Sequence, residues 1–347
     1  MKDVRLVLVG FGVVGQGFAE LLSTKQQYLQ AQYGVNLSLL GVANTRHGFI
    51  YRAEGLSVPT LLELARLRRP LSDHPNVERW STTMQGLRAV SADVLVEVTP
   101  TNINDAEPAI SHIRTALKKG MHAVTANKGP GALAAQELFA LAKEHGVQLR
   151  MEAAVMAGTP VISTIREGLA GATIVSLRGI LNGTTNYILS AMAEGKDYAE
   201  VLADAQAKGY AETDPTADVE GFDAVAKTLI LAALAFNTPL KPEQVERQGI
   251  TDVTREQVRD ALNSGKRIKL IASLRRMPGA TRAESRLEAS VKPVALPLTN
   301  TLAHVNGTLN ALSISTDTLS EVTITGPGAG RIETAQGLLA DVLACVR

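Results

Sequence analysis

Apolar runs of strand length alternate with helix-like patterns over the first 153 residues. The first run, at residues 5–9, is almost continuously apolar, as in a parallel strand covered on both faces. Further strands are predicted at residues 36–42, 93–98, 122–124 and 148–153, and helices at residues 15–22, 61–65, 108–119 and 133–145. Strands that alternate with helices in this way predict an α/β fold with a doubly wound parallel sheet.

The pattern changes after residue 152, where small residues surround a bend at Pro160. A long helix is predicted from apolar residues at helical spacing, namely Val219, Phe222, Ala226, Leu229, Ala233 and Phe236. Strands are predicted at residues 175–179, 291–296, 311–315 and 321–325, and a closing helix at residues 334–346. We therefore expect a first domain at 1–151, an α+β domain at 152–330, and a C-terminal helix at 331–347 that returns to the first domain.

A glycine-rich turn follows the first predicted strand. Its sequence is Gly10-Phe11-Gly12-Val13-Val14-Gly15, with a strand before it and a helix after it, as the dinucleotide-binding fingerprint of Rossmann-like sheets requires. In that fingerprint the first glycine allows a tight turn, the second lets a pyrophosphate approach the backbone, and the third lets helix and strand pack closely. Residues 10–15 are therefore predicted to bind a dinucleotide, with an ordinary glycine-rich turn as the alternative.

The end of the second strand bears on the choice of dinucleotide. NAD-binding sheets carry an acidic residue there, which bonds the ribose 2′-hydroxyl. This chain has Asn44 and then Arg46, so a cation stands where a carboxylate would favour NAD. NADP is therefore favoured over NAD, and a solvated loop arginine is the alternative. Later strands deliver Thr99 and Lys128 to the same edge of the sheet, where ligands bind.

Charged residues gather where a loop meets the long predicted helix, within residues 209–227. Asp218 and Glu220 are predicted to lie in the first turn of that helix, where its dipole favours negative charge. Asp223 and Lys227 are four residues apart, so they share a helix face. An exposed ion pair worth about 0.3–0.5 kcal/mol is the simpler interpretation. The apolar continuation of the face into Ile230 favours a pocket instead.

Composition excludes several classes of function. The 347 residues carry a net charge of +1 and only 4% aromatic residues, which gives no basis for binding nucleic acid or an anionic membrane. The single cysteine, Cys345, excludes an internal disulfide framework and is predicted to pack in the core. No apolar run reaches the length of a membrane span, and no signal-peptide pattern is seen, so we expect a cytoplasmic protein.

The chain resembles the homoserine dehydrogenases along its whole length. The resemblance rests on the glycine turn, on the segments 124–128, 152–160, 177–187 and 326–330, and above all on Gly209-Tyr210-Ala211-Glu212-Thr213-Asp214-Pro215 and its continuation to Lys227. It implies reversible reduction of L-aspartate 4-semialdehyde to L-homoserine with NAD(P)H, in threonine and methionine biosynthesis. It also implies a homodimer formed by the second domain, so that this domain serves both catalysis and dimerisation.

The resemblance also implies roles for individual residues. Lys227 matches the family's proton donor or acceptor, Asp223 its substrate-orienting partner, and Lys128 a second lysine beside nicotinamide and substrate. Glu212 matches the acid that holds the substrate's ammonium group. The other residues that we expect at the substrate are Gly209, Tyr210, Asp218, Gly183 and Thr184, and those that we expect at the cofactor, besides residues 10–15, are Asn44, Arg46, Thr99, Lys128, Gly328 and Gly330.

The segment 152–160 aligns with a monovalent cation site of relatives. By that resemblance Glu152, Val155, Ala157 and Thr159 hold Na⁺ or K⁺, mostly through backbone carbonyls, and oxygen ligands suit such a hard cation. The chain departs from the family at Met156, where glycine is common, and at Glu333, where proline is common. It has no sequence for the C-terminal regulatory domain of some relatives, so we expect a short form without feedback by such a domain.

Two other interpretations remain open from the sequence. One is a different Rossmann dehydrogenase of a small amino or hydroxy acid; aspartate-semialdehyde dehydrogenase is disfavoured because its chemistry needs a cysteine elsewhere than Cys345. The other is a catalytically silent nucleotide-sensing or scaffold protein, which predicts the loss of the pocket lysines or carboxylates. Lys128, Glu212, Asp223 and Lys227 are all present, which favours an enzyme.

Overall fold

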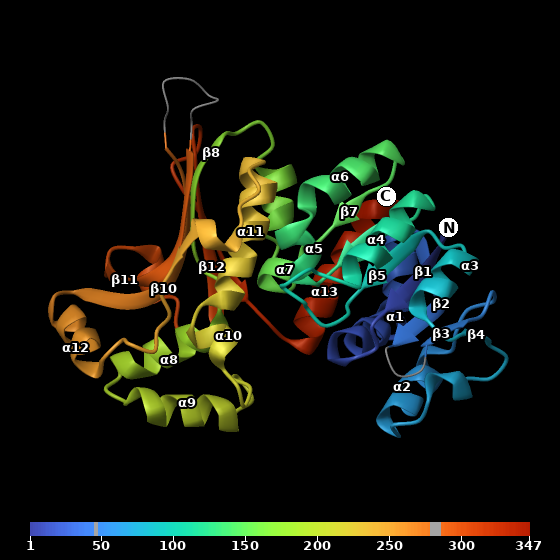
Figure 1. Cartoon of the computed structure of the whole chain (residues 1–347), viewed down its shortest axis with the longest axis horizontal. Coiled ribbons are helices and arrows are strands. Elements are labelled where there is room, and N and C mark those ends of the chain that lie inside the picture. The colour runs from blue at the N-terminus through green and yellow to red at the C-terminus, as the bar shows by residue number, and fades with distance from the viewer. Residues whose placement is uncertain (45–47, 278–285) are drawn as a thin grey trace. The chain divides into compact units, whose positions relative to one another are not determined.

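The computed structural model describes residues 1–44, 48–277 and 286–347, and the chain forms two compact units (Figure 1). Residues 1–158 and 330–347 make up the first unit, and residues 159–329 the second. The chain therefore leaves the first unit once and returns to it for its last helix. The boundaries that we expect from the sequence fall after residues 151 and 330.

A seven-stranded sheet in the order β4-β3-β2-β1-β5-β6-β7 forms the centre of the first unit. The strands are β1 (Lys2–Val9), β2 (Val35–Asn44), β3 (Gly48–Tyr51), β4 (Glu78–Trp80), β5 (Val94–Glu97), β6 (His122–Thr125) and β7 (Leu149–Arg150). Five of them, from β2 through β1 to β7, are parallel to their neighbours, whereas β3 and β4 add antiparallel pairs at one edge. The parallel sheet is confirmed, and its antiparallel edge was not predicted.

Helices cover the sheet of the first unit on both faces. They are α1 (Val13–Tyr33), α2 (Val58–Arg66), α3 (Thr83–Ala89), α4 (Ala109–Lys118), α5 (Lys128–Leu133), α6 (Ala135–Glu144), α7 (Ala153–Met156) and α13 (Arg331–Val346). Leu6 and Leu8 share one core with α1, α13 and Cys345, which confirms the packing role of the cysteine. Val7 alternates with them and faces the other side. There α4 packs on β5 and β6, so the sheet is doubly wound.

A six-stranded sheet in the order β13-β12-β8-β10-β11-β9 forms the second unit. The strands are β8 (Ile174–Ile180), β9 (Val245–Arg247), β10 (Lys266–Met277), β11 (Arg286–Pro297), β12 (Leu309–Thr316) and β13 (Val322–Pro327). All pairs are antiparallel except β11 with β9. The helices are α8 (Gly183–Ala193), α9 (Tyr198–Ala207), α10 (Thr216–Val219), α11 (Phe222–Phe236) and α12 (Arg255–Asn263), of which α8, α11 and α12 contact β10. This is the predicted α+β arrangement.

Several element boundaries differ from the sequence prediction. Residues 148–153 are not one strand, because β7 ends at Arg150 and α7 begins at Ala153. The helix predicted at residues 133–145 is α6, and the short helix α5 before it was not predicted. Helix α13 begins at Arg331 rather than at residue 334. No helix in the three described segments has the length and hydropathy needed to cross a membrane.

The prediction for the long helix was partly wrong. Asp218 lies in a separate short helix, α10, and Glu220 lies outside both helices. The break occurs at Gly221, whose φ of 81° is a left-handed conformation that glycine adopts without steric cost. Phe222 is consequently 38% exposed instead of buried, and the guanidinium of Arg247 covers its ring at 4.1 Å from the ring centroid.

A lysine on β10 lies in the interior of the second unit. Lys269 is 1% exposed, and its Nζ donates to Asn186 Oδ1 at 2.9 Å and to the Val305 carbonyl oxygen at 2.6 Å. Contacts at 3.2 Å to Ser190 Oγ and 3.1 Å to Asn306 Oδ1 complete its surroundings. Burial without a carboxylate, together with the charge of Arg267, lowers the pKa of Lys269 to about 8. This amine ties α8 to the sheet.

The lowered pKa predicts a pH-dependent stability. Between about pH 8 and 10.5 the unfolded chain holds a proton at Lys269 that the folded chain has released, so stability rises with pH in this window. Relative to Lys269→Met, the free energy of unfolding of the wild type should increase by about 3 kcal/mol from pH 7.5 to 10.5. Urea denaturation of both proteins at several pH values measures this difference, and a difference that does not change with pH would contradict it.

Candidate active site

The start of α8 organises the polar centre of the second unit. Asn182 caps this helix, since its Oδ1 accepts the backbone N–H of Thr185 at 2.9 Å. Its Nδ2 donates in the opposite direction, to Asp218 Oδ1 at 2.7 Å and to Asp223 Oδ2 at 3.1 Å. One amide therefore fixes a helix start and holds two carboxylates from α10 and α11.

The Asp223–Lys227 pair on α11 lies beside this amide and is buried. Lys227 Nζ lies 2.8 Å from Asp223 Oδ2, and the two side chains are only 8% and 16% exposed. Nζ also donates to the carbonyl oxygen of Leu181 at 2.6 Å, where the chain has left β8 and not yet entered α8. The interpretation as an exposed surface ion pair was therefore wrong. The buried amino group of Lys227 is thus held by the Asp223 carboxylate and the Leu181 carbonyl oxygen.

Asp218 is the second carboxylate of the cluster. Burial and the charge of Asp223 raise its pKa, whereas hydrogen bonds from Asn182 and Thr184 and the charge of Lys227 oppose the rise. Thr184 Oγ1 lies 2.9 Å from Asp218 Oδ2 and 2.7 Å from the Tyr210 carbonyl oxygen. The single hydroxyl proton can serve only one of these acceptors. A proton on Asp218 would satisfy both contacts, in agreement with the raised pKa.

The loop before α10 carries the remaining substrate residues that the sequence suggests. Gly209 has a φ of 72°, which explains a glycine there. The ring of Tyr210 is 45% exposed and meets Tyr187 edge-on with 5.1 Å between centroids. Glu212 is exposed, and its carbonyl oxygen accepts Gln206 Nε2 at 3.1 Å. Gly183, Thr184, Tyr210, Asp218, Asp223 and Lys227 are thus brought together by direct contacts or short segments, whereas Glu212 is exposed and joins them only through its loop.

The glycine turn of the first unit has the shape that a pyrophosphate requires. Gly10 has a φ of 104°, and a Cβ on Gly15 would clash with the Gly10 carbonyl, so both positions need glycine. A Cβ on Gly12 would meet no atom within 4 Å, which leaves open space above the turn. Gly12 is also the N-cap of α1 and makes no side-chain cap. The first N–H groups of α1 can therefore receive an anion, so these residues fit a dinucleotide phosphate.

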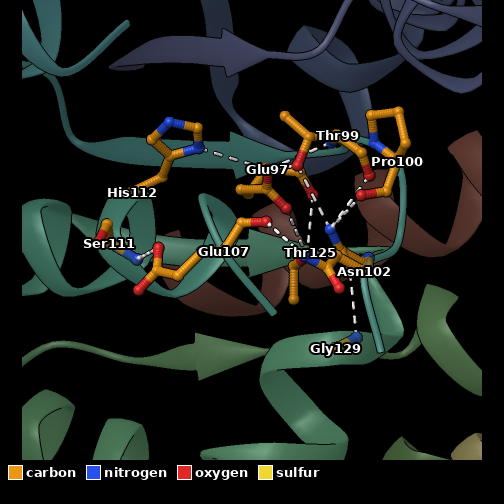
Figure 2. A network of polar contacts seen from close by, with 10 residues as sticks. Glu97, Thr99, Pro100, Asn102, Glu107, Ser111, His112, Thr125 and Gly129 are labelled. Atoms are coloured by element: carbon orange, nitrogen blue, oxygen red, sulfur yellow. Dashed lines mark hydrogen bonds and ion pairs between the residues drawn. The ribbon is translucent and has the colours of Figure 1, made fainter. Parts of the chain in front are cut away.

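The carboxyl ends of β5 and β6 form a second polar cluster in the first unit (Figure 2). The buried carboxylate of Glu97 accepts the Thr99 hydroxyl and, at 3.2 Å, the Thr99 backbone N–H. Asn127 Nδ2 donates to the Thr99 carbonyl at 3.1 Å, and Asn127 Oδ1 accepts the N–H of Gly129 at 3.0 Å. Lys128, between these two residues, is the first residue of α5.

The other expected cofactor and cation residues have less distinctive surroundings. Asn44 ends β2, and Arg46 lies outside the described residues. Gly328 packs against the side chain of Asn310, and Gly330 has a φ of 136°. The residues expected at the cation are all buried, with Glu152, Val155 and Ala157 in the first unit and Thr159 in the second. The described residues contain no group of three His, Cys, Asp or Glu side chains that could hold a metal ion.

Sequence reasoning did not single out three buried polar residues. The bonds of Asn182 to both carboxylates were not expected from the sequence. Glu97 and Asn127 were given no role. An asparagine just before a helix is a signal for a cap that could also have suggested a second bond, since its amide nitrogen remains free to donate.

Comparison with known proteins decides the family. Residues 160–343 match the family model described as homoserine dehydrogenase, and residues 10–152 match the model described as the homoserine dehydrogenase NAD binding domain. The chain belongs to the homoserine dehydrogenase family. It is an NAD(P)-dependent oxidoreductase that interconverts L-aspartate 4-semialdehyde and L-homoserine in threonine and methionine biosynthesis, and the alternative interpretations from the sequence are thereby excluded.

Individual relatives cover nearly the whole of this homoserine dehydrogenase. The NAD(+)-dependent homoserine dehydrogenase of Pseudomonas canavaninivorans is 38% identical over 344 residues, which are 99% of this chain and 96% of the relative. That of Methanocaldococcus jannaschii is 39% identical over 97% of each chain. Among solved structures, a hyperthermophilic archaeal homoserine dehydrogenase in complex with NADPH superposes with a TM-score of 0.83 at 31% identity, covering 99% of this chain and 98% of that one.

Replacement of Asp218 and of Asp223 by asparagine should change the free energy of unfolding in opposite directions. Asp218→Asn can keep both hydrogen bonds, accepting from Asn182 and donating to Thr184, and it removes a buried charge near Asp223. Because the pKa of Asp218 is raised, the wild type loses stability as pH rises through that pKa, and the variant does not. The free energy of unfolding of the variant, measured with urea, should therefore increase relative to that of the wild type as the pH is raised from 4 to 7.

Asp223→Asn is the matched control for this prediction. It leaves the buried Lys227 ammonium without its charged partner, which should cost about 3 kcal/mol at pH 7. If both substitutions destabilise the protein equally, Asp218 is not the carboxylate whose burial is unfavourable, and the prediction is wrong.

Proposed function

We propose that Lys227 is the proton donor and acceptor of this homoserine dehydrogenase. Hydride transfer to the aldehyde carbon leaves an oxyanion that must gain a proton, and the reverse reaction must remove one from the alcohol. An ammonium group has three N–H bonds. Within residues 1–44, 48–277 and 286–347, Nζ has two partners, Asp223 and the Leu181 carbonyl. The third N–H is the one that can serve a substrate oxygen, and this is the observation that carries the proposal.

Asp223 and Asn182 orient this lysine. The carboxylate of Asp223 and the Leu181 carbonyl hold Nζ from two sides, so the direction of the remaining N–H is fixed by the fold and not by the substrate. Asn182 in turn restrains Asp223 through its 3.1 Å hydrogen bond. Preorganised donors of this kind lower the barrier because they need no reorganisation when charge develops on the substrate oxygen.

Substrate recognition is proposed for residues around the same cluster. Glu212, which is exposed, is suited to pair with the ammonium group of an amino-acid aldehyde, and Gly209 and Tyr210 shape the loop that carries it. Asp218, Gly183 and Thr184 line the start of α8. Pairing with the amino group would explain a preference for aspartate semialdehyde over a simple aldehyde.

Cofactor binding is proposed for Gly10, Phe11, Gly12, Val13, Val14 and Gly15, together with Asn44, Arg46, Thr99, Lys128, Gly328 and Gly330. The open space at Gly12 and the uncapped start of α1 support a phosphate there. The bound dinucleotide supplies the hydride, and the protein supplies position and charge. Lys128 stands at the carboxyl edge of the parallel sheet, where such ligands bind.

NADP is proposed as the preferred cofactor, because Arg46 follows Asn44 where an acidic residue would favour NAD. The relatives include both a protein named as NAD(+)-dependent and one solved with NADPH. The preference between NAD and NADP must therefore be inferred from the residues of this chain. A monovalent cation held by Glu152, Val155, Ala157 and Thr159, and a homodimer, are proposed on the family resemblance. Sodium or potassium titration of activity and light scattering test them.

Loss of Lys227 should remove turnover and spare cofactor binding. Lys227→Ala is expected to lower kcat about 10³-fold, the usual range for a lost proton-transferring group. Absorbance of the nicotinamide band with aspartate semialdehyde measures turnover, and fluorescence measures the Kd for NADPH, which should change less than about twofold. Lys241→Ala, at an exposed lysine of the same unit, is the control. Near-normal turnover of Lys227→Ala would reject its role.

Substitution of Arg46 should discriminate between the two cofactors. Arg46→Ala is expected to raise the KM for NADPH at least tenfold and to leave that for NADH within about twofold, because only NADPH carries the 2′-phosphate. The control is Arg52→Ala, whose guanidinium pairs with Glu54 at 3.4 Å. Equal effects of Arg46→Ala on both cofactors would exclude a 2′-phosphate contact.

A further inference from the structure

The buried carboxylate of Glu97 in the first unit has no role in the proposed reaction. Glu97, the last residue of β5, is 0% exposed. In the part of the chain that the structure describes, no lysine or arginine pairs with it, and His112 Nδ1 lies 3.6 Å from Oε1. A buried carboxylate without a cationic partner is costly to keep. Its retention at a sheet edge that binds ligands therefore calls for an explanation.

The hydrogen bonds of Glu97 lead to Asn127. The Thr99 backbone N–H and hydroxyl both donate to Glu97 Oε1. Having given its proton to the carboxylate, the Thr99 oxygen can only accept, and Asn127 Nδ2 donates to it at 3.3 Å. A second route runs from the Asn127 backbone N–H to Thr125 Oγ1 at 2.9 Å, and that hydroxyl lies 3.4 Å from Glu97 Oε2 as well as 2.9 Å from the main-chain carbonyl oxygen of Glu97.

Backbone donors fix the direction of this network. Gly129 N–H must donate to Asn127 Oδ1, so the amide nitrogen of Asn127 must face Thr99 and the Pro100 carbonyl. The Oε1 atom of Glu97 accepts both Thr99 donors and ends the chain of donors on the other side. Figure 2 shows that the side chains of Thr99, Thr125 and Glu97 converge between the ends of the two strands. The Asn127 amide is therefore held in one orientation from both ends.

Asn127 is also the N-cap of α5, and Lys128 is the next residue. We propose that Glu97 is a positioning residue for Lys128, acting through Thr99, Thr125 and Asn127 to fix where α5 begins and where the lysine leaves the backbone. Close packing beneath α5 leaves no room for adjustment, because a Cβ on Gly129 would lie 2.7 Å from Ala106 Cβ and from the Asn102 carbonyl oxygen. The inference rests on the proposed role of Lys128 in the reaction.

Glu97→Gln tests the inference with little change of shape. The amide puts an N–H donor in place of one acceptor oxygen of the group that ends the network. We expect kcat to fall about tenfold, with KM for homoserine, Kd for NADP⁺ and the thermal midpoint little changed, because misplacement of a reacting group mainly affects the chemical step. The matched control is Glu107→Gln, since Glu107 accepts the Ser111 N–H at 3.2 Å and does not contact Thr99 or Asn127.

A double-mutant cycle separates positioning from general stability. Thr125→Val removes the hydroxyl on the second route and should also lower kcat, whereas Thr125→Ser retains the hydroxyl and should restore it. The two losses should not add in Glu97→Gln/Thr125→Val, because both act through Asn127. Full additivity with a falling thermal midpoint, or a loss in Glu107→Gln as large as in Glu97→Gln, would overturn the proposal.

Lys128→Ala, measured alongside, separates this inference from the proposed function. A large loss of kcat in Lys128→Ala with normal kcat in Glu97→Gln rejects the role of Glu97 alone. Normal kcat in Lys128→Ala rejects the role of Lys128 and the inference with it. If Glu97→Gln does not fold, Glu97→Asp replaces it. The aspartate side chain is one methylene shorter, so its carboxylate lies farther from Thr99 and kcat should still fall. A wild-type kcat in this variant would overturn the proposal.

Discussion

The contact between Lys227 and Asp223 is the interaction on which the polar cluster of the second unit depends. A buried ammonium is tolerated only with a charged partner and further acceptors, and here these are one carboxylate and one main-chain carbonyl. That carbonyl belongs to Leu181, which follows the last residue of β8 and precedes α8, so neither element uses it. The switch from strand to helix at this point therefore provides the oxygen that the lysine needs.

The start of α11 is constrained for the same reason. Asp223 must lie one turn before Lys227 and close to the start of the helix, where its negative charge also suits the helix dipole. Gly221, in a left-handed conformation, ends α10 and lets α11 begin in a new direction. Asp218 can then approach from α10 at an angle that a single continuous helix would not allow, and Asn182 bridges the two carboxylates.

Much of the fold could be predicted from residue patterns, because the parallel strands and amphipathic helices repeat at regular spacing. Spacing also identified the pairing of Asp223 with Lys227, since i and i+4 positions always share a face. The separation of α10 from α11 was missed, because the periodicity of apolar residues continues across Gly221 while the backbone does not. The strands β3 and β4 are four and three residues long, too short for alternation to be visible.

Contacts distant in sequence were beyond prediction. Glu97 ends an apolar strand, and nothing nearby indicates whether its carboxylate faces solvent or the interior. Its partner Thr125 is 28 residues away on the adjacent strand, and His112 lies on a helix between them. Only the pairing of β5 with β6 brings these groups together. The register of the sheet, and not any local motif, brings this carboxylate into the polar cluster at the ends of β5 and β6.

Both units use an asparagine N-cap in the same way. Asn182 and Asn127 each accept a backbone N–H with Oδ1 and donate with Nδ2, the first to two carboxylates and the second to the oxygens of the loop at Thr99 and Pro100. Aspartate or serine would cap these helices equally well. A carboxylate could not donate, however, and would add a third negative charge beside Asp218 and Asp223. A hydroxyl has only one proton and a shorter reach. The second hydrogen bond, and not the cap, therefore requires an amide. Asn127 begins α5 next to Lys128, and Asn182 begins α8 next to Leu181, whose carbonyl oxygen holds Lys227. In each case the residue that caps the helix also aligns a proposed reactive lysine.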